Sequence, residues 1–178
     1  MKLSAILVAV LLVFAGLGCS ADSDTSDNSD RNGDVPELVE DVQEVNPQEL
    51  GEQIGEVYFN ALEDVTILLA EYPEVDEVRS QVEHLKQENI LVLVELGKIR
   101  EELSDQDKAI VDMGIMSVLD SLNDVEWYQT YSDICSHYVS VDRDFYDLVV
   151  SFNIIGQYAN FDLLKQQEPE EAERLGIQ

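Results

Sequence analysis

Basic residues are scarce in this sequence: ten Lys and Arg stand against 38 Asp and Glu, which gives the 178 residues a net charge of −28. Nucleic-acid binding depends on clustered Lys and Arg that neutralise phosphates, so this composition excludes a nucleic acid as a partner. The deficit continues through residues 47–178, where 29 acidic residues accompany only eight basic ones. A surface of this charge favours solubility, attracts cations and complements a basic partner.

Histidine is equally rare, with only His84 and His137 in the chain. Metal sites in helical bundles use Glu-x-x-His motifs on paired helices, but Gln81 stands where His84 would need Glu, and no second motif occurs. Asp133 and His137 are four residues apart and make only half a site. The Cys-x-x-Cys-His motif of c-type haem proteins is absent. We therefore expect no metal and no cofactor.

An uncharged run from Leu3 to Gly18 follows Met1-Lys2 at the N-terminus. It is shorter than the roughly 20 residues of a membrane-spanning helix, and its length and charge are typical of a signal peptide. The run ends in Gly16-Leu17-Gly18-Cys19-Ser20. This ending resembles the lipobox of bacterial lipoproteins, in which a small residue precedes a cysteine that is acylated and becomes the new N-terminus.

The resemblance covers residues 1–20, and Gly16 departs from it because Leu is usual three positions before the cysteine. It implies a signal peptide over residues 1–18, lipid (palmitate) on Cys19 and a membrane location in the cell envelope. In a bacterium with two membranes it favours the outer membrane, since Asp22 lies one place too late for inner-membrane retention. The alternatives are an ordinary secretory signal and an uncleaved anchor. With Cys19 acylated, Cys135 has no intramolecular partner, which excludes a disulfide framework.

Residues 20–34 consist mainly of Ser, Asp and Asn, and they contain no apolar side chain larger than that of Ala21. We interpret residues 19–34 as a disordered tether, because such a segment has nothing to bury and repels itself. Residues 28–34 also resemble the start of a calcium loop. However, Val39 stands at the twelfth position, where that loop needs a bidentate Glu, so the tether interpretation is preferred.

The remaining residues, 35–178, carry helical patterns throughout. A short helix is expected over 35–45, and Asn46-Pro47 with Glu49 predicts the start of a second helix that Pro73 closes. Apolar residues repeat every three or four positions over 75–103, a heptad pattern with Asn89 in one core position. A second apolar face around Ile90 to Val94 indicates that this helix lies inside a bundle.

Further helices are expected over 104–122, about 124–138 and 142–165, with a helical turn after Pro169. Small residues at 114, 117 and 121 would allow a neighbouring helix to approach closely. No segment alternates with the period of two that marks a strand. The sequence therefore predicts an all-α fold, a helical bundle of about five helices with antiparallel neighbours.

Aromatic residues concentrate near the C-terminus, where nine of the thirteen fall between Trp127 and Phe161. Most have the spacing of a core, but Tyr128 and Tyr146 lie off those stripes. Tyr and Trp combine an apolar body with a polar tip, so Trp127, Tyr128 and Tyr146 are the candidate binding surface. Cys135 is a candidate nucleophile only with a base beside it; its alternative is a small buried hydrophobe.

No catalytic motif stands out, so we expect a non-enzymatic protein. The expected function is that of a membrane-anchored extracytoplasmic lipoprotein whose helical domain has a protein-interaction or structural role, with an envelope protein as the partner. The alternative is a small-molecule or cation-binding lipoprotein with a pocket between its C-terminal helices. A filled bundle interior favours the first function, and an aromatic-lined cavity favours the second.

Overall fold

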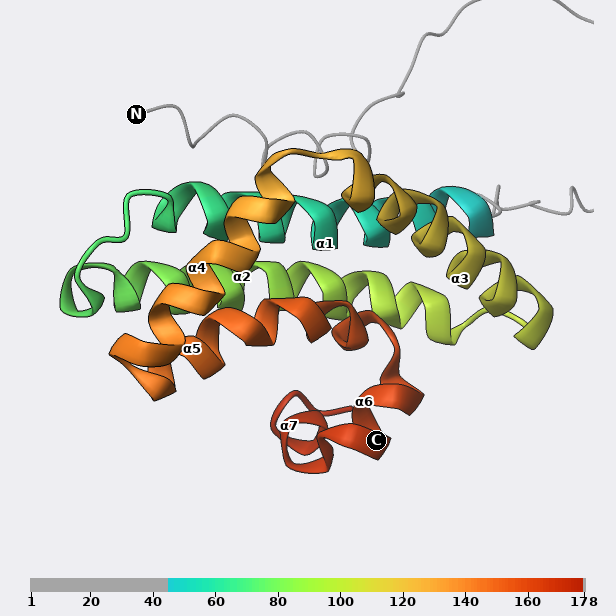
Figure 1. Cartoon of the computed structure of the whole chain (residues 1–178). Coiled ribbons are helices and arrows are strands. Elements are labelled where there is room, and N and C mark those ends of the chain that lie inside the picture. The colour runs from blue at the N-terminus through green and yellow to red at the C-terminus, as the bar shows by residue number, and fades with distance from the viewer. Residues whose placement is uncertain (1–44, 178) are drawn as a thin grey trace, which may run out of the picture. The chain divides into compact units, whose positions relative to one another are not determined.

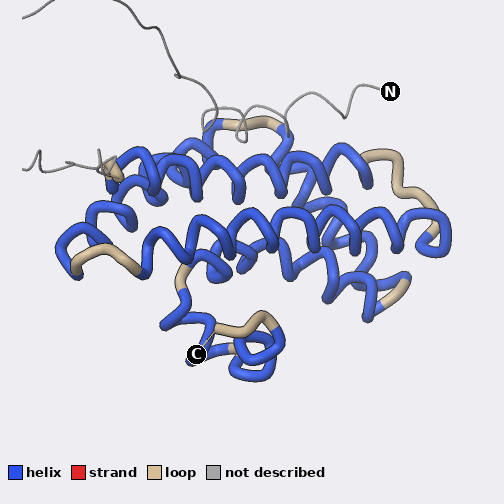
Figure 2. Tube along the Cα trace, turned by 180° about the vertical axis from the view of Figure 1, so that it is seen from behind, coloured by secondary structure: helices blue, strands red, loops and turns tan. Residues whose placement is uncertain are grey.

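The computed structural model describes residues 45–177 of the chain. The predicted signal peptide (1–18), the tether (19–34) and the first ten residues of the predicted short helix (35–45) lie outside these residues. The described part contains helices and loops but no strand (Figure 2), which confirms the all-α prediction. Its elements are α1 (Pro47–Leu69), α2 (Val75–Glu101), α3 (Asp105–Leu119), η1 (Asp120–Asp124), α4 (Trp127–Val141), α5 (Arg143–Val150), η2 (Ser151–Ala159), α6 (Phe161–Gln167) and α7 (Pro169–Arg174), where η is a 3₁₀-helix.

Helix α1 begins where the sequence predicts. The Asn46 side chain accepts a hydrogen bond from the backbone N–H of Gln48 at 3.1 Å and donates one to Glu49 Oε1 at 2.9 Å. Pro47 occupies the first helical position, where its missing N–H costs nothing. After α1 the chain turns at Tyr72, whose φ of 51° is rare for a bulky residue, and returns antiparallel as α2 (Figure 1).

The heptad pattern predicted for α2 describes only its first half. Val78 and Val82 are buried as expected, but farther along Val92 and Ile99 are 36% and 40% exposed. There the buried positions belong to the second apolar face, which includes Leu93. An α-helix has 3.6 residues per turn, so a stripe that repeats every 3.5 residues drifts away from the core as the helix lengthens.

Close packing joins α1 to α3, which lies along it. A Cβ atom built on Gly51 would collide with the carbonyl oxygen of Val111, and it would lie 3.0 Å from the Cα of Gly114. A Cβ atom on Gly55 would lie 2.8 Å from that of Val118. The close approach expected of Gly114 is therefore present, and glycines on α1 provide the other half of it. Ser117 and Ser121, the other small residues of the predicted strip, are exposed.

The single helix predicted for residues 142–165 is wrong, because this segment forms α5, η2 and α6 in succession. Apolar residues repeat here at intervals of three, which matches the three residues per turn of a 3₁₀-helix. The residues of this repeat are all buried: Val149, Phe152, Ile155, Tyr158, Phe161 and Leu164. At Asn160 the backbone becomes extended, and its side chain caps α6 by accepting from the N–H of Leu163 at 3.1 Å.

These breaks raise the number of helices above the predicted five. Residues 45–177 contain seven α-helices and two 3₁₀-helices, of which η2 packs on both α1 and α2. The core is continuous, and it extends into the C-terminal segment through Leu164 on α6, Ala172 on α7 and Ile177 after α7. No helix in the described range has both the length and the apolar character needed to cross a membrane.

Candidate functional site

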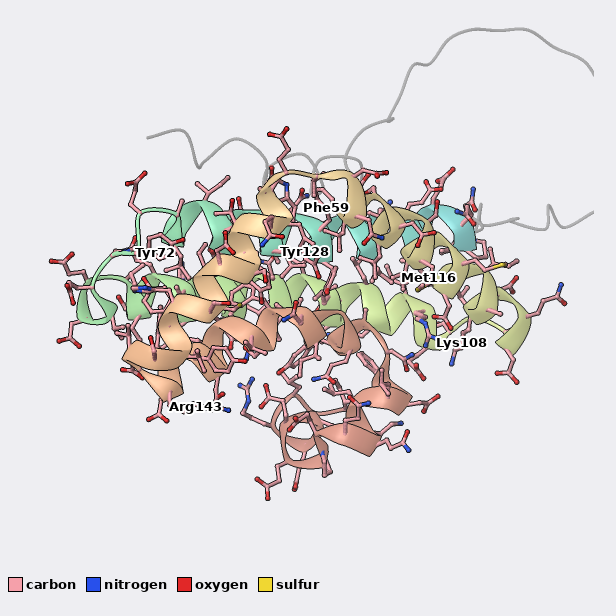
Figure 3. The ribbon with its side chains drawn as sticks, in the orientation of Figure 1. Phe59, Tyr72, Lys108, Met116, Tyr128 and Arg143 are labelled. Atoms are coloured by element: carbon pink, nitrogen blue, oxygen red, sulfur yellow. The ribbon has the colours of Figure 1, made fainter. Side chains whose placement is uncertain are left out.

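An aromatic surface forms where α1 meets the start of α4. Phe59 and Trp127 pack edge to face with their ring centroids 5.2 Å apart, and the Tyr128 ring lies 6.0 Å from that of Trp127. Figure 3 shows Phe59 and Tyr128 close together on one side of the domain. Phe59 and Trp127 are half-buried, whereas Tyr128 is 36% exposed. We call Phe59, Trp127 and Tyr128 the aromatic surface.

A buried tyrosine, Tyr131, and a half-buried one, Tyr58, anchor the helices that carry this surface. Tyr131, one turn beyond Trp127 on α4, donates from its hydroxyl to the carbonyl oxygen of Val149 at 3.0 Å. Tyr58 on α1 donates in the same way to Asn153 at 3.0 Å, and burial with Tyr128 nearby raises the pKa of Tyr58 to about 12. Both hydroxyls remain protonated donors at neutral pH. They join α1 and α4, the two helices that carry the aromatic surface, to the α5–η2 segment.

The third predicted surface residue, Tyr146, belongs to a different place. It is half-buried on α5, where the guanidinium of Arg143 lies 4.9 Å from its ring centre. Arg143 follows the far end of α4, as Figure 3 shows, while Trp127 is the first residue of that helix. The structure thus brings Trp127 and Tyr128 together but separates Tyr146 from them.

Acidic residues lie close to the residues of the aromatic surface in the sequence, on α1 and at the start of α4. Glu126 immediately precedes Trp127, and Glu56 and Glu63 lie one helical turn before and after Phe59. Burial and the neighbouring Glu63 raise the pKa of Asp64. Aromatic rings on helices rich in carboxylates complement an apolar patch with basic residues at its edge.

The sulfur and imidazole groups offer little reactivity. Cys135 is half-buried beside Tyr131, and burial raises the pKa of its thiol, the opposite of what an activated nucleophile needs. The His137 ring packs 4.7 Å from that of Tyr72, and His84 lies on α2 with Glu88 Oε1 3.3 Å from its Nε2. Within residues 45–177, no three His, Cys, Asp or Glu side chains are placed to hold one metal ion.

A polar cleft of about 290 Å³ lies between α2, η2 and the C-terminal helices. Its lining combines an ammonium group, an amide, two carboxylates, two hydroxyls and one aliphatic side chain, from Lys86, Gln157, Glu168, Glu171, Ser151, Tyr158 and Ile154. The amide of Gln157 is buried in its wall. We call this the polar cleft.

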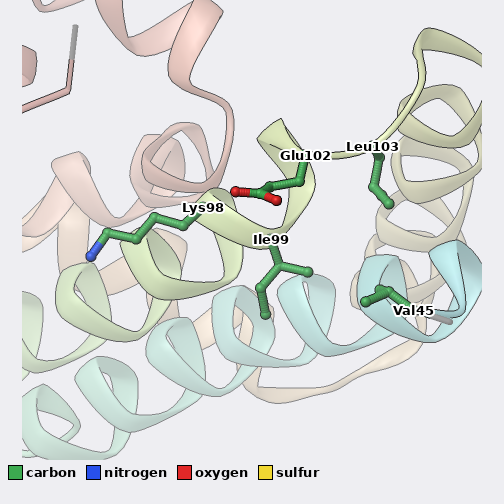
Figure 4. A pocket seen from close by; sticks show the side chains of 5 residues that line it. All are labelled: Val45, Lys98, Ile99, Glu102 and Leu103. Carbon is green, nitrogen blue, oxygen red and sulfur yellow. The ribbon is translucent and has the colours of Figure 1, made fainter. Parts of the chain in front are cut away.

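A second cleft, of about 270 Å³, lies where the end of α2 passes the start of α1 (Figure 4). Ile99, Leu103 and Val45 provide its apolar lining, with Lys98 and Glu102 at the edge. The ammonium of Lys98 is paired with Glu95 at 2.7 Å. This cleft provides apolar contact area and no arrangement of reactive groups.

Phe59 and the residues of both clefts, Gln157 among them, were not predicted as site residues from the sequence. Phe59 follows Tyr58 at the edge of the apolar stripe of α1, and adjacent aromatics beside a stripe are a usable signal for a partly exposed ring. Gln157 carries no such signal, because nothing in a sequence distinguishes a buried amide from an exposed one. Its role depends on how η2 is wound.

Comparison with protein-family models, with curated proteins and with solved structures found no significant match to this chain. The class that the structure itself defines is that of an acidic, all-α helical domain.

Proposed function

We propose that this protein is a lipid-anchored lipoprotein of the bacterial cell envelope, whose helical domain acts by binding another protein through the aromatic surface. The observation that carries the proposal is the exposed ring of Tyr128, packed in a row with Trp127 and Phe59 and fixed by the Tyr58 and Tyr131 hydroxyls. Trp and Tyr side chains are enriched among the residues that dominate binding energy at interfaces. Rigid rings also lose little conformational freedom on binding.

The partner's chemistry follows from the charge of the domain. Residues 47–178 carry a net charge of −21, and Glu56 and Glu126 flank the aromatic surface. A partner with an apolar centre and Lys or Arg around it is attracted at long range, while an acidic one is repelled. We therefore propose a basic envelope protein as the partner. Association is expected to slow as salt is added, because salt screens this attraction.

Membrane attachment is the part of the proposal that rests on the sequence. Gly18-Cys19 supplies the cleavage and acylation site, and residues 19–34 supply the tether. One acyl chain binds a membrane only marginally, whereas the two or three chains of a lipoprotein hold it firmly. The proposed role is thus to keep an acidic binding domain at the membrane surface.

Site-specific photo-crosslinking in living cells tests the binding surface. A photoreactive phenylalanine analogue replaces Tyr128 in one strain and Gln87, an exposed residue of α2, in a control strain. The proposal predicts one discrete protein adduct at position 128 and none at position 87. Absence of an adduct at 128, or the same adduct from both positions, would refute the aromatic surface as the site of binding.

The alternative function, small-molecule binding, is supported by one observation, the polar cleft beside the C-terminal helices. The residues that line it come from α2 as well as from η2 and the start of α7, whereas the sequence predicts a pocket between the C-terminal helices alone.

A further inference from the structure

Two polar side chains of the cleft make incomplete interactions with the residues that the structure describes. Gln157 is only 7% exposed, and its Oε1 makes no hydrogen bond to any residue that the structure describes. Lys86, on the α2 side, likewise has no hydrogen bond or ion pair with a residue of the described range. Buried polar groups in native proteins are almost always paired, so a buried amide without a partner calls for an explanation such as a bound molecule.

The charges of the cleft are mixed. Glu171 is largely neutralised, because Arg174 donates to both of its carboxylate oxygens at 2.7 Å and the Tyr158 hydroxyl donates to Oε1 at 3.3 Å. Glu168, between α6 and α7, has no such partner in the described part of the chain. The pKa of Lys86 is lowered by burial, and the nearby carboxylates of Glu171 and Glu168 offset this effect only in part. One ammonium and one carboxylate, each without a hydrogen bond or ion pair among the described residues, thus line the same small space.

We propose that the polar cleft binds a free α-amino acid with an apolar side chain. The carboxylate of the ligand accepts from Lys86, and its ammonium group donates to Glu168 and to Gln157. Rotation about the last torsion of Gln157 presents either Oε1 or Nε2 to the ligand, so one amide serves either group. The aliphatic side chain of Ile154, exposed beside the cleft, accommodates the apolar part of the ligand.

Other classes of ligand fit less well. A simple anion is opposed by Glu168 and by the net charge of the domain, and a simple cation is opposed by Lys86. A zwitterion satisfies both charges. The size agrees, since about 290 Å³ lies just below the range of roughly 300–1,000 Å³ for sites that hold drug-sized molecules.

Equilibrium dialysis of the full-length mature protein in detergent tests the site with three probes: L-leucine, N-acetyl-leucine and leucinamide. Each analogue lacks one of the two charges. Leucine is expected to bind saturably, and each analogue to bind at least about tenfold more weakly, because it loses a charged hydrogen bond to Lys86 or to Glu168. Absence of saturable leucine binding, or equal binding of an analogue, would overturn the proposal.

Variants locate the binding. Lys86→Met and Gln157→Leu are expected to lose leucine binding, whereas Lys98→Met, which removes an ammonium elsewhere on α2, keeps it. Unchanged binding in Lys86→Met and Gln157→Leu would place the ligand elsewhere and contradict the assignment. The analogue series needs no variant, so it decides the matter if a substitution prevents folding. The polar cleft shares no residue with the aromatic surface, so either proposal can fail without the other.

Discussion

The contact between α1 and α3 makes a sharp prediction about stability. In Gly51→Ala, the new methyl group would collide with the carbonyl oxygen of Val111 and would lie 3.0 Å from the Cα of Gly114. Both neighbours are backbone atoms within a helix, so no side chain can rotate away. Helices α1 and α3 have to separate, and the packing around Leu50 and Ile54 loosens with them.

The expected loss of stability combines two effects. Overpacking a close contact costs about 1–3 kcal/mol, and backbone atoms that cannot move favour the upper half of that range. Replacing Gly by Ala inside a helix returns about 1 kcal/mol through better helix propensity. The net destabilisation is therefore about 1–2 kcal/mol. For a domain of this size, about 4 °C of Tm corresponds to each kcal/mol, so Tm should fall by about 4–8 °C.

Urea unfolding and calorimetry of the full-length protein measure this loss, with Gly156→Ala as the matched control. A Cβ atom on Gly156 meets only the Tyr58 ring, at 3.6 Å, which is an ordinary contact. The control should be neutral or more stable by about 0.4–1 kcal/mol, since Ala restricts the unfolded chain. Equal stability of Gly51→Ala and Gly156→Ala would refute the reasoning.

Three further predictions concern single interactions and charge. Tyr138→Phe removes the hydrogen bond of 2.7 Å from the Tyr138 hydroxyl to the Pro73 carbonyl and should cost about 0.5–1.5 kcal/mol in urea unfolding, whereas no loss would show that the bond contributes nothing. The pKa of Asp142 is lowered by the N–H of Phe145 and by Arg79, so the stability that its carboxylate contributes is present above the ordinary carboxyl pKa and is lost as pH falls through the lowered value. The stability difference between wild type and Asp142→Asn should therefore shrink below about pH 4. A difference independent of pH would contradict this. Raising NaCl from about 0.01 M to about 0.15 M shortens the Debye length from about 30 Å to about 8 Å, so Tm should rise as repulsion within the acidic domain is screened, and a falling Tm would contradict the role given to charge.

Most of the fold could be predicted from the sequence, because its local signals agree with one another. The Asn46-Pro47 start, the beginning of a helix at about residue 104 and the long helix from residue 75 appear where the patterns predict them. The helix after Ser104 begins with a side-chain cap, because the Ser104 hydroxyl accepts from the N–H of Asp107 at 3.2 Å. These features depend on residues within a few positions of each other, which sequence reasoning reads well.

The errors arise where distant contacts choose between two acceptable local structures. Either apolar face of α2 could face the core, and α2 packs against both α1 and η2 with the face that includes Leu93 buried. Arg100, buried and paired with Asp112 at 3.0 Å, gave no sign of burial in the sequence. The period of three over residues 149–164 is compatible with an α-helical stripe as well as with a 3₁₀-helix, so the pattern alone does not decide between them.

The candidate sites were predicted less completely than the fold. Trp127 and Tyr128 were identified because they stand out by residue type, and the structure adds Phe59 beside them. Tyr146 has the same residue type, but it lies on α5, which begins beyond the end of α4 that is opposite to Trp127 and Tyr128. The polar cleft depends on side chains of α2, η2 and α7 meeting in space, so no local pattern indicates it.

The claim on which the proposed function most depends is that lipid on Cys19 holds the helical domain at a membrane. Mass spectrometry of the N-terminal peptide, prepared from the protein purified out of membranes, measures this directly. The account predicts a peptide that begins at Cys19 and carries the added mass of acyl chains. A peptide that still contains residues 1–18, or one whose Cys19 is unmodified, would contradict it.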